Sequence, residues 1–246
     1  MYLKEYIRTF FLLIGRLLYC NRKSKILYYH DVSRPDGNSY TPMSTPFDVF
    51  VSHMNMLQQY GDIVPRINRN NGQFQIAFDD GFLGVYDNKE FFLERNIFPT
   101  VFVAKKLVGM DGYMNEKQIK ELSGLGFNIQ SHTISHLDLT SFGDEELTKE
   151  LLGSKEYLES LLGKCVDEIC CPIGYYNDEV IEKAKNVGYK KIYLSYPSPV
   201  NVDDFVEGRY LCQSLSLTQF KLVLRGGADI LKSRYINLHR REKAKV

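Results

Sequence analysis

The chain has 246 residues, enough for one α/β barrel or two small domains, and 44% of them are hydrophobic, which allows a sizeable core. Its formal net charge of +1 gives no basic footprint for nucleic acid, so we expect no nucleic-acid partner. The five cysteines are odd in number and share no recurring spacing, which argues against a disulfide framework and against a cysteine-type metal site.

The first 24 residues predict a helix ahead of the main domain. Residues 9–15 form an apolar run that could be a short signal-peptide core, but Arg16 interrupts it and no small-residue cleavage site follows before Lys23. The run is too short to span a bilayer. We therefore expect a retained amphipathic helix that packs on the domain or contacts a membrane surface. This favours a cytoplasmic location or a peripheral one at the inner membrane, with a periplasmic or extracellular location still open.

Residues 25–215 alternate strand-like and helix-like segments. Thr45-Pro46 is a helix-start signal, and Gly126, Gly163 and Gly188 are helix-end signals. About seven strands alternating with helices predict a parallel sheet, closed or partly closed into a barrel. We expect one domain at 25–215, then a C-terminal helix and basic tail at 216–246. The strands are expected at 26–29, 63–67, 74–78, 100–104, 127–130, 168–171 and 191–195, and the helices at 47–60, 85–96, 116–125, 144–162 and 178–187.

Two polar motifs follow strand-like runs. In the first, Asp79 and Asp80 precede Gly81; adjacent strand residues point to opposite faces, so the carboxylates suit divided roles, one on a metal and one on protons. The second places His132 and His136 four residues apart, so that a turn would close both on one ion. Alone, the first motif is more often a solvated turn, and the second is as often a helix surface or a packed pair. Together they indicate an Asp-His-His metal site with open positions, which is typical of a hydrolase.

Four expected strands end in polar or turn residues. The carboxyl ends of barrel strands share one rim, where the active sites of such barrels lie. We therefore expect these residues in one cleft. They are His30-Asp31 after the first run, Asp79-Asp80, His132, and 172–175 after a later run.

These motifs resemble those of the metal-dependent polysaccharide deacetylases, the NodB-homology or chitooligosaccharide deacetylase-like family. The resemblance rests on Phe-Asp-Asp-Gly at 78–81 and Ser-His-Thr-x-x-His at 131–136, and it continues through 137–140, 144–162 and 171–178. It covers roughly residues 25–215. The family fold is a distorted (β/α)7 barrel, in agreement with the strand count, and the family implies removal of an acetyl group from a sugar by a metal-activated water.

The resemblance also implies a role for each matching residue. Asp79 corresponds to the general base, and the backbone N–H of Ile173 to the oxyanion donor. Pro172 and Tyr175 correspond to residues beside the substrate, although Tyr175 could also merely pack. One divalent ion is implied, with zinc as the default and cobalt, nickel or iron also compatible with the donor set. The implied metal ligands are Asp80, His132 and His136.

The sequence departs from the family pattern at two positions. Many members carry an arginine two residues before Pro172, where it orients the base, but Cys170 stands there in this chain. The family's catalytic histidine usually comes late, yet the late candidate, His239, precedes a basic tail and is interpreted as a surface or tail residue. We expect His30 to act instead, because 26–32 resembles that late motif moved to the N-terminus, as in the circularly permuted branch that acts on exopolysaccharides such as poly-N-acetylglucosamine. The alternative is a structural histidine that caps the first strand.

Other features predict ordinary structure. His53, inside a helical pattern, is expected to be solvated or packed. The charges at 144–159 predict a solvated helix face. The basic residues at 232–245 predict a frayed tail, with contact to an acidic membrane or polymer as the alternative.

Residues and resemblance together predict a metal-dependent hydrolase that removes N-acetyl groups from a sugar polymer or oligosaccharide, such as an exopolysaccharide or its lipid-linked precursor. The expected partner is therefore an N-acetylated carbohydrate, and the sequence carries no signal for the oligomeric state. Two alternatives remain open. One is a peptidoglycan or other amidohydrolase on the same site, and the other is a carbohydrate-binding pseudoenzyme that has kept its ligands.

Overall fold

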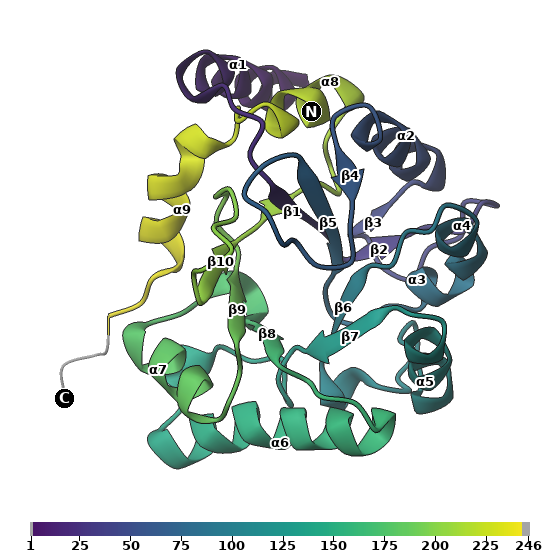
Figure 1. Ribbon diagram of the computed structural model, residues 1–246, viewed down its shortest axis with the longest axis vertical. Coiled ribbons are helices and arrows are strands. Elements are labelled where there is room, and N and C mark those ends of the chain that lie inside the picture. Colours follow the sequence, from purple (N-terminus) through teal and green to yellow (C-terminus); the bar gives the residue numbers. More distant parts are fainter. Residues whose placement is uncertain (1, 243–246) are drawn as a thin grey trace.

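Parallel strands form the centre of the molecule, and helices pack around their outside (Figure 1). This computed structural model describes residues 2–242, with side chains from Glu5 onward. The main sheet follows the order β10-β9-β8-β7-β6-β5-β1-β11, and the paired strands run parallel. Their bounds are β1 Lys25–Tyr29, β5 Gln73–Phe78, β6 Thr100–Val103, β7 Asn128–Ser131, β8 Glu168–Cys170, β9 Lys191–Leu194, β10 Val206–Gly208 and β11 Tyr210–Leu211.

Helices connect these strands and cover their outer face (Figure 1). Short strands β2 (Asp31–Val32) and β3 (Ser44–Thr45) pair with each other, and β4 (Asp62–Ile63) pairs with β5. The helices are α1 Tyr2–Tyr19, α2 Phe47–Leu57, α3 Leu83–Asp87, α4 Lys89–Glu94, α5 Glu116–Gly124, α6 Asp144–Leu162, α7 Asp178–Asn186, α8 Leu217–Leu224 and α9 Lys232–His239, with 3-10 turns η1 Lys105–Leu107, η2 Leu139–Ser141, η3 Pro172–Gly174 and η4 Asp229–Leu231.

One bent segment nearly closes the barrel. β10 pairs with β9 at one edge of the sheet, β11 pairs with β1 at the other edge, and Arg209 alone separates β10 from β11. Counted as a single bent strand, β10 and β11 complete seven parallel positions around the barrel. The predicted α/β fold, a distorted (β/α)7 barrel, is confirmed.

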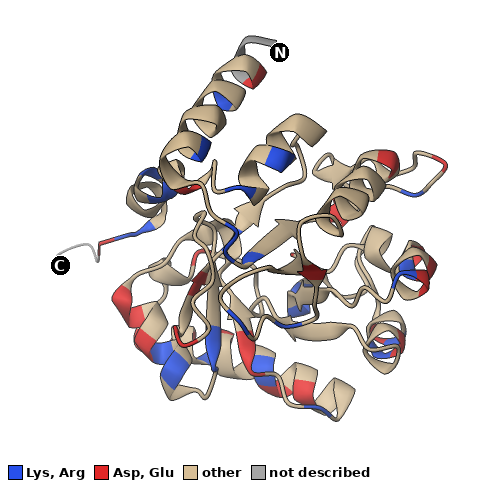
Figure 2. Ribbon diagram, turned by 45° about the horizontal axis from the view of Figure 1, so that its top comes forward, with Lys and Arg blue, Asp and Glu red and all other residues tan. Residues whose placement is uncertain are grey.

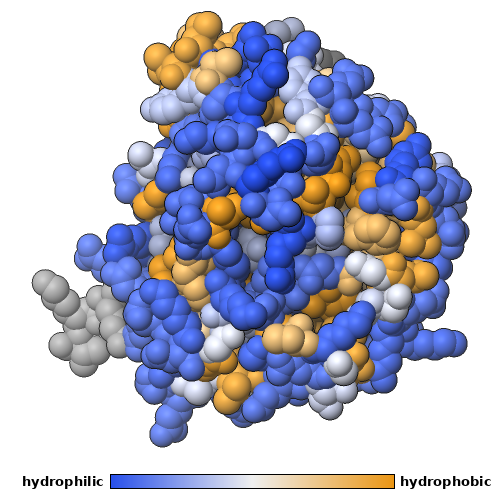
Figure 3. Space-filling view, viewed as in Figure 1, coloured by the Kyte–Doolittle hydropathy of each residue, from blue (hydrophilic) through white to orange (hydrophobic). Residues whose placement is uncertain are grey.

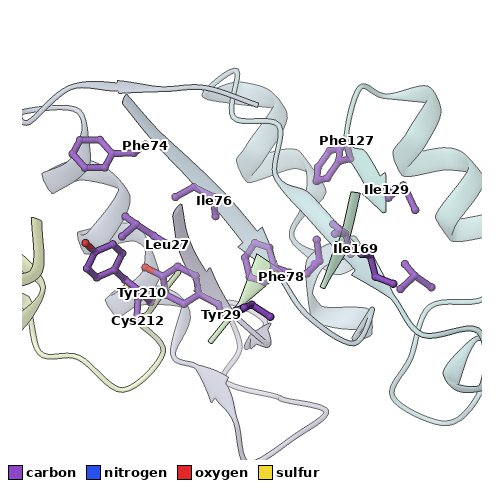
Figure 4. Packing of buried hydrophobic residues seen from close by; sticks show 14 of the residues in the cluster. Leu27, Tyr29, Phe74, Ile76, Phe78, Phe127, Ile129, Ile169, Tyr210 and Cys212 are labelled. Carbon is purple, nitrogen blue, oxygen red and sulfur yellow. Dashed lines mark hydrogen bonds between the residues drawn. The ribbon is translucent and has the colours of Figure 1, made fainter. Parts of the chain in front are cut away.

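Side chains on each strand alternate between a helix-facing layer and the barrel interior. Figure 4 shows the helix-facing layer, in which Leu27 of β1 lies beside Ile76 of β5 and Tyr29 of β1 beside Phe78 of β5. The alternation places Asp79, directly after β5, on the same side as Ala77 and therefore toward the interior. The buried apolar residues of that interior are Ile26, Tyr28, Ala77, Phe102, Cys170, Tyr193 and Val200.

Two predicted elements were wrong in extent, and one pair of strands was missed. The helix expected at 85–96 is instead two helices, α3 and α4. Helical geometry is interrupted at Asn88, whose side-chain amide donates to the carbonyls of Gly84 and Ser33. The strand expected at 63–67 shrinks to β4, since Pro65 lacks the N–H that a longer ladder needs. The strands β10 and β11 were not predicted.

The C-terminal segment is attached to the barrel as far as the structure describes it. The N–H of Arg241 donates to the carbonyl of Tyr176 at 2.9 Å, and Arg240 forms an ion pair with Asp178 at 2.7 Å. The prediction of a frayed tail from 232 onward is therefore wrong up to Glu242. Residues 243–246 of that prediction lie outside the described residues.

The predicted N-terminal helix forms as α1 and packs against α8 and η4. Within residues 2–242, none of the helices combines the length and the apolar character that crossing a membrane requires.

Candidate active site

The predicted polar residues lie at one rim of the barrel, directly after the ends of the strands. Parallel strands end on the same side, and β1, β5 and β7 are followed by His30, Asp79 and His132 respectively. β8 is followed by the turn η3, Pro172–Gly174. The expectation that these residues share a rim is therefore met.

Three ligand-type atoms converge at this rim. The Oδ1 atom of Asp80 lies 3.2 Å from Nε2 of His132 and 2.8 Å from Nε2 of His136. The Nδ1 atom of His132 lies 2.8 Å from the carbonyl oxygen of Cys170, which can only accept, so Nδ1 carries the proton. In a neutral ring, Nε2 of His132 then directs a lone pair at a carboxylate oxygen. Two acceptors that face each other in this way fit a cation between them, and the carbonyl partner fixes the tautomer that a ligand needs.

The charges of this cluster point the same way. Burial acts to raise the pKa of Asp80, but the hydrogen bonds and charges of His132 and His136 outweigh it and hold that pKa far below its usual range. Burial acts to lower the pKa of His136, but Asp80 and then Asp79 raise it above its ordinary value. The cluster therefore favours a positive charge, either as a proton or as a metal ion.

Left-handed turns bring the ligands together. Asp80 has φ 71° and Gly81 has φ 81°, so the chain leaves β5 sharply and both carboxylates face the same cleft. The expectation that they point to opposite faces holds only within a strand, and Asp80 has left it. His136 has φ 59° and Thr133 has φ 70°, which supplies the turn that two histidines four residues apart require.

Glu150 of α6 holds the histidine turn in place. Its Oε2 atom accepts hydrogen bonds from the N–H groups of Ile134 at 3.0 Å and Ser135 at 2.9 Å, and the side chain is buried. The prediction of a solvated charged face over 144–159 is wrong at this residue, because two backbone N–H groups satisfy its carboxylate.

Arg209 binds the predicted base. Its Nη1 atom lies 2.6 Å from Oδ1 of Asp79 and its Nη2 atom 2.9 Å from Oδ2, a two-pronged ion pair with both side chains almost fully buried. Burial acts to raise the pKa of Asp79, but the charge and hydrogen bonds of Arg209 outweigh it, with smaller contributions from His132 and His30, so the pKa lies below its ordinary value. An arginine therefore does orient this carboxylate, from the junction of β10 and β11 rather than from position 170.

Cys170 makes room for that arginine. Its Sγ atom lies 2.9 Å from Nη2 of Arg209, in the barrel interior. Asp79, His132 and Cys170 also bring ligand-type atoms within 4.8 Å of one another, but the guanidinium already contacts both Asp79 and Cys170. Of the two groups, Asp80, His132 and His136 therefore leave more room for a cation, and the carboxylate of Asp79 has an arginine partner although position 170 is a cysteine.

His30 has a neutral partner. Its Nδ1 atom lies 2.6 Å from Oε1 of Gln213, in the loop after β11. An amide oxygen accepts, so Nδ1 donates, and Nε2 is not part of this hydrogen bond. Its sequence neighbour Asp31 is buried, and burial raises the pKa of that carboxyl to about 6 despite backbone hydrogen bonds. The hydrogen-bond partner of the His30 ring is therefore Gln213.

The turn η3 carries the remaining predicted residues. Ile173 has φ 61°, a rare backbone conformation for a β-branched side chain, and strain of this kind gathers at functional turns. Pro172 is buried, and Tyr175 is half-buried with the guanidinium of Arg241 3.8 Å from its ring centre.

The two other histidines pack against aromatic residues. His239 is half-buried and its ring lies 6.0 Å from that of Tyr175, so it is a packed residue at the end of α9 rather than a free tail residue. His53 is buried, stacks on Phe220 at 4.0 Å and contacts the Tyr29 hydroxyl at 3.0 Å. The packed alternative for His53 is the correct one.

Three supporting residues were missed in the sequence: Arg209, Gln213 and Glu150. The apolar pairs on either side of Arg209, at 205–206 and 210–211, are a strand signal that could have placed it in the sheet. Gln213 and Glu150 lie in a loop and on a helix, and no local pattern distinguishes them from solvated residues.

A parallel barrel whose strands end in an Asp-His-His cluster beside a buried Asp–Arg pair belongs to the hydrolase class of barrels. Comparison with known proteins gives the family: the polysaccharide deacetylase family profile matches residues 66–192, just over half of the chain, and the chain belongs to this family. It is an enzyme family of carbohydrate deacetylases, so the recognition and the enzyme class predicted from the sequence are confirmed.

Curated relatives agree with this placement. YxkH of Bacillus subtilis (strain 168), which carries a polysaccharide deacetylase name, is 28% identical over 193 residues, covering 74% of this chain and 67% of the relative. A protein named peptidoglycan-N-acetylglucosamine deacetylase from Bacillus cereus is 30% identical over 145 residues, covering 57% of this chain and 64% of the relative. The matches thus span about two thirds of each relative's length.

Solved structures share the fold. A polysaccharide deacetylase from Bacillus cereus superposes with a TM-score of 0.70 at 24% identity, covering 83% of this chain and 69% of that one. IcaB from Ammonifex degensii superposes with a TM-score of 0.68 at 19% identity, covering 85% of this chain and 98% of that one. At these identities the likeness supports the barrel and nothing finer.

Proposed function

We propose that this chain is a metal-dependent hydrolase that removes N-acetyl groups from a sugar polymer or oligosaccharide. Family membership supports carbohydrate deacetylation. The observation that carries the finer proposal is the position of the Asp79–Arg209 pair beside the unpaired ligand atoms of Asp80 and His132. One carboxylate is held ionised by an arginine, and its neighbour faces two histidines.

Asp80, His132 and His136 would hold one divalent ion, with zinc as the expected metal and cobalt, nickel or iron compatible with the same ligands. When bound, such an ion lowers the pKa of a coordinated water and polarises the acetyl carbonyl. The half-exposed His136 side chain, 29% accessible, leaves this site open toward solvent and substrate.

Asp79 accepts the proton of the attacking water. Arg209 binds both carboxylate oxygens, so the base is oriented before the substrate binds. The same ion pair keeps the carboxylate ionised and makes it a weaker base. The strained turn at Ile173 presents its N–H to the developing oxyanion, and Pro172 and Tyr175 border the sugar.

His30 supplies the proton that the leaving amine needs, because an amine is expelled poorly as its anion. Gln213 accepts from Nδ1 and so directs Nε2 of the His30 ring into the cleft. When the ring is doubly protonated, Nε2 carries the proton that passes to the leaving amine, and the ring returns to its neutral form.

The substrate is an N-acetylated carbohydrate, with a surface exopolysaccharide or its lipid-linked precursor as the first choice. Peptidoglycan is the second candidate, favoured by the Bacillus cereus relative whose name states that activity. A third relative, from Sinorhizobium fredii, is named chitooligosaccharide deacetylase and is 23% identical over 135 residues. A panel of poly-N-acetylglucosamine, peptidoglycan fragments and chito-oligomers separates these substrates.

Acetate release from N-acetylglucosamine oligomers by the metal-loaded protein tests the proposal. Asp79→Asn should keep the metal and lose roughly two to four decades of rate, the usual worth of general acid–base catalysis. A wild-type protein that binds these oligomers but releases no acetate with zinc, cobalt or nickel would instead be a carbohydrate-binding module.

A further inference from the structure

The outward face of α1 is apolar along the whole described helix. Tyr6, Phe10, Leu17 and Leu18 expose 72, 59, 81 and 67% of their surface, which is unusual for side chains of this size. Figure 3 shows hydrophobic atoms gathered at the top of the molecule, where α1 lies in Figure 1. The full set of exposed apolar residues, called the α1 ridge below, is Tyr6, Ile7, Phe10, Phe11, Leu13, Leu17, Leu18 and Tyr19.

The opposite face of α1 is fixed to the barrel, so the ridge cannot turn inward. Leu12 is 2% exposed, and a side chain at Gly15 would come within 2.0 Å of the carbonyl oxygen of Gly227. Arg8 donates to the carbonyl of Ser214 at 2.6 Å and to its hydroxyl at 3.0 Å. Arg8 and Gly15 face the barrel, whereas Phe10 and Leu17 face outward. This distribution is typical of a helix whose outward face contacts an apolar environment.

We propose that the α1 ridge binds the surface of an anionic lipid bilayer, with α1 lying in the plane of the membrane. A helix of 18 residues is about 27 Å long, and a mixture of Phe, Leu and Tyr on one face with arginines beside it is typical of interfacial helices. Figure 2 shows α1 projecting from the barrel as a single convex rod. Such a rod inserts among lipid headgroups more readily than it forms a flat protein interface.

The basic residues near the α1 ridge favour a membrane that contains anionic lipid. Besides Arg8, whose side chain is bound to Ser214, residues 1–24 contain four Lys or Arg and one Glu, and Lys221 and Arg225 lie in and directly after α8, which has no acidic residue. Asp229 of η4, which packs against α1, is engaged by the Tyr210 hydroxyl at 2.6 Å and the Asn21 amide at 2.9 Å. Basic residues beside an apolar helix are attracted to negative headgroups within a Debye length of the surface.

The inward face of α1 contacts the loop that supports the catalytic rim. Arg8 binds Ser214, whose neighbour Gln213 holds His30. A docked α1 would therefore bring the rim near the membrane and its attached glycans. Binding to the bilayer goes beyond the proposed reaction and does not depend on it.

Vesicle co-sedimentation of the 246-residue chain tests the proposal. Wild type should sediment with phosphatidylcholine vesicles that contain about 30% phosphatidylglycerol, and much less with pure phosphatidylcholine or in high salt. Phe10→Glu with Leu17→Glu should weaken binding by more than about tenfold, because two apolar side chains leave the interface and two negative charges enter it. The matched control is Met110→Glu with Leu125→Glu, which makes the same change at exposed apolar residues on another face and should leave binding intact.

A fluorescent variant keeps the proposal testable even if the glutamate variant folds poorly. The chain has no Trp, so Phe10→Trp places a single reporter on the ridge and Met110→Trp places one elsewhere. Anionic vesicles should shift the emission of Phe10→Trp to the blue and leave Met110→Trp unchanged. Wild type that stays free of vesicles, equal shifts in both tryptophan variants, or a stable dimer in solution that Phe10→Glu with Leu17→Glu dissociates would overturn the proposal, the last result in favour of a second copy.

Discussion

The two ends of the barrel differ in how their charged side chains are paired. At the amino ends of the strands, Arg66 pairs with Glu168 at 2.8 Å and Lys191 with Glu207 at 3.0 Å, so each of these buried acids has a basic partner. At the carboxyl ends, Asp79 is paired with Arg209, but Asp80 faces two histidine nitrogens.

This difference separates a structural end from a functional one. A buried acid that already has its cation has little left to bind, and removing a partner costs stability. A buried acid that faces only histidine nitrogens has no permanent cation as a partner and can bind a metal ion. The pairing of buried charges, rather than their number, therefore marks the candidate site.

The largest effect is expected at Asp80. Asp80→Ala or His132→Ala should abolish both metal binding and activity, because either change leaves two ligands where three converge. Elemental analysis of the purified variants gives the metal content. Glu207→Gln, at the paired end of the barrel, is the control and should keep the metal content of wild type; full metal content in either rim variant would disprove the ligand assignment.

Arg209 should come next. Arg209→Ala leaves Asp79 buried without its partner, which should cost about 3–5 kcal/mol of stability and at least about a hundredfold in kcat. Urea unfolding and acetate release measure the two effects. Adding Cys170→Arg to this variant returns an arginine to the position that the family resemblance favours, and it should recover part of both losses. A double variant no better than Arg209→Ala would show that position 170 cannot reach the base in this barrel.

His30 should have a smaller effect that spares the metal. His30→Ala should lower kcat by roughly two decades with metal content intact, since the proton donor is lost and the ligands stay. Gln213→Leu should lower kcat less, by releasing the ring that Gln213 orients. His239→Ala is the matched control and should change kcat little; equal activity in wild type and His30→Ala, or a larger loss in His239→Ala, would contradict this assignment.

The smallest effect concerns the paired end. Burial raises the pKa of Glu207 to about 7 although Lys191 acts in the opposite direction. The folded state therefore holds this proton more tightly than the unfolded chain, so Glu207 stabilises at pH values below about 4.5 and loses that contribution as the pH rises toward 7. Glu207→Gln should flatten the dependence of the unfolding free energy on pH in this window by up to about 2 kcal/mol and leave kcat unchanged. Urea unfolding at pH 5 and pH 7 measures it, and an unaltered slope would show that another group titrates there.

Local sequence patterns predicted most of the barrel and the candidate ligands. Apolar runs that end in Asp79-Asp80 and before His132 predicted both the strands and the rim, because a buried parallel strand is a continuous apolar run and its end is where polar residues can begin. The junction at Arg209 was missed although apolar pairs flank it, because β10 and β11 have only three and two residues and give a weak periodic signal. Their position is set by pairing with β9 and β1, which lie far away in sequence.

The supporting residues could not be predicted for the same reason. Glu150 is one of several acids on α6, and only its place opposite the turn after His132 makes it a buried acceptor. Arg209 takes the place of a motif arginine from a different strand, so a search at position 170 finds Cys170 and suggests a loss. A side chain that acts across the barrel is specified by tertiary structure, not by a local motif.

An anomalous-scattering crystal structure of the zinc-soaked protein tests the central claim most directly. We predict one strong peak bound by Oδ1 of Asp80 and Nε2 of His132 and His136, with Arg209 still on Asp79 and no peak at Glu168 or Glu207. A peak between Asp79 and Cys170 with Arg209 displaced, or no peak at the rim at all, would contradict the claim that the unpaired acceptors at the carboxyl ends of the strands hold a metal ion.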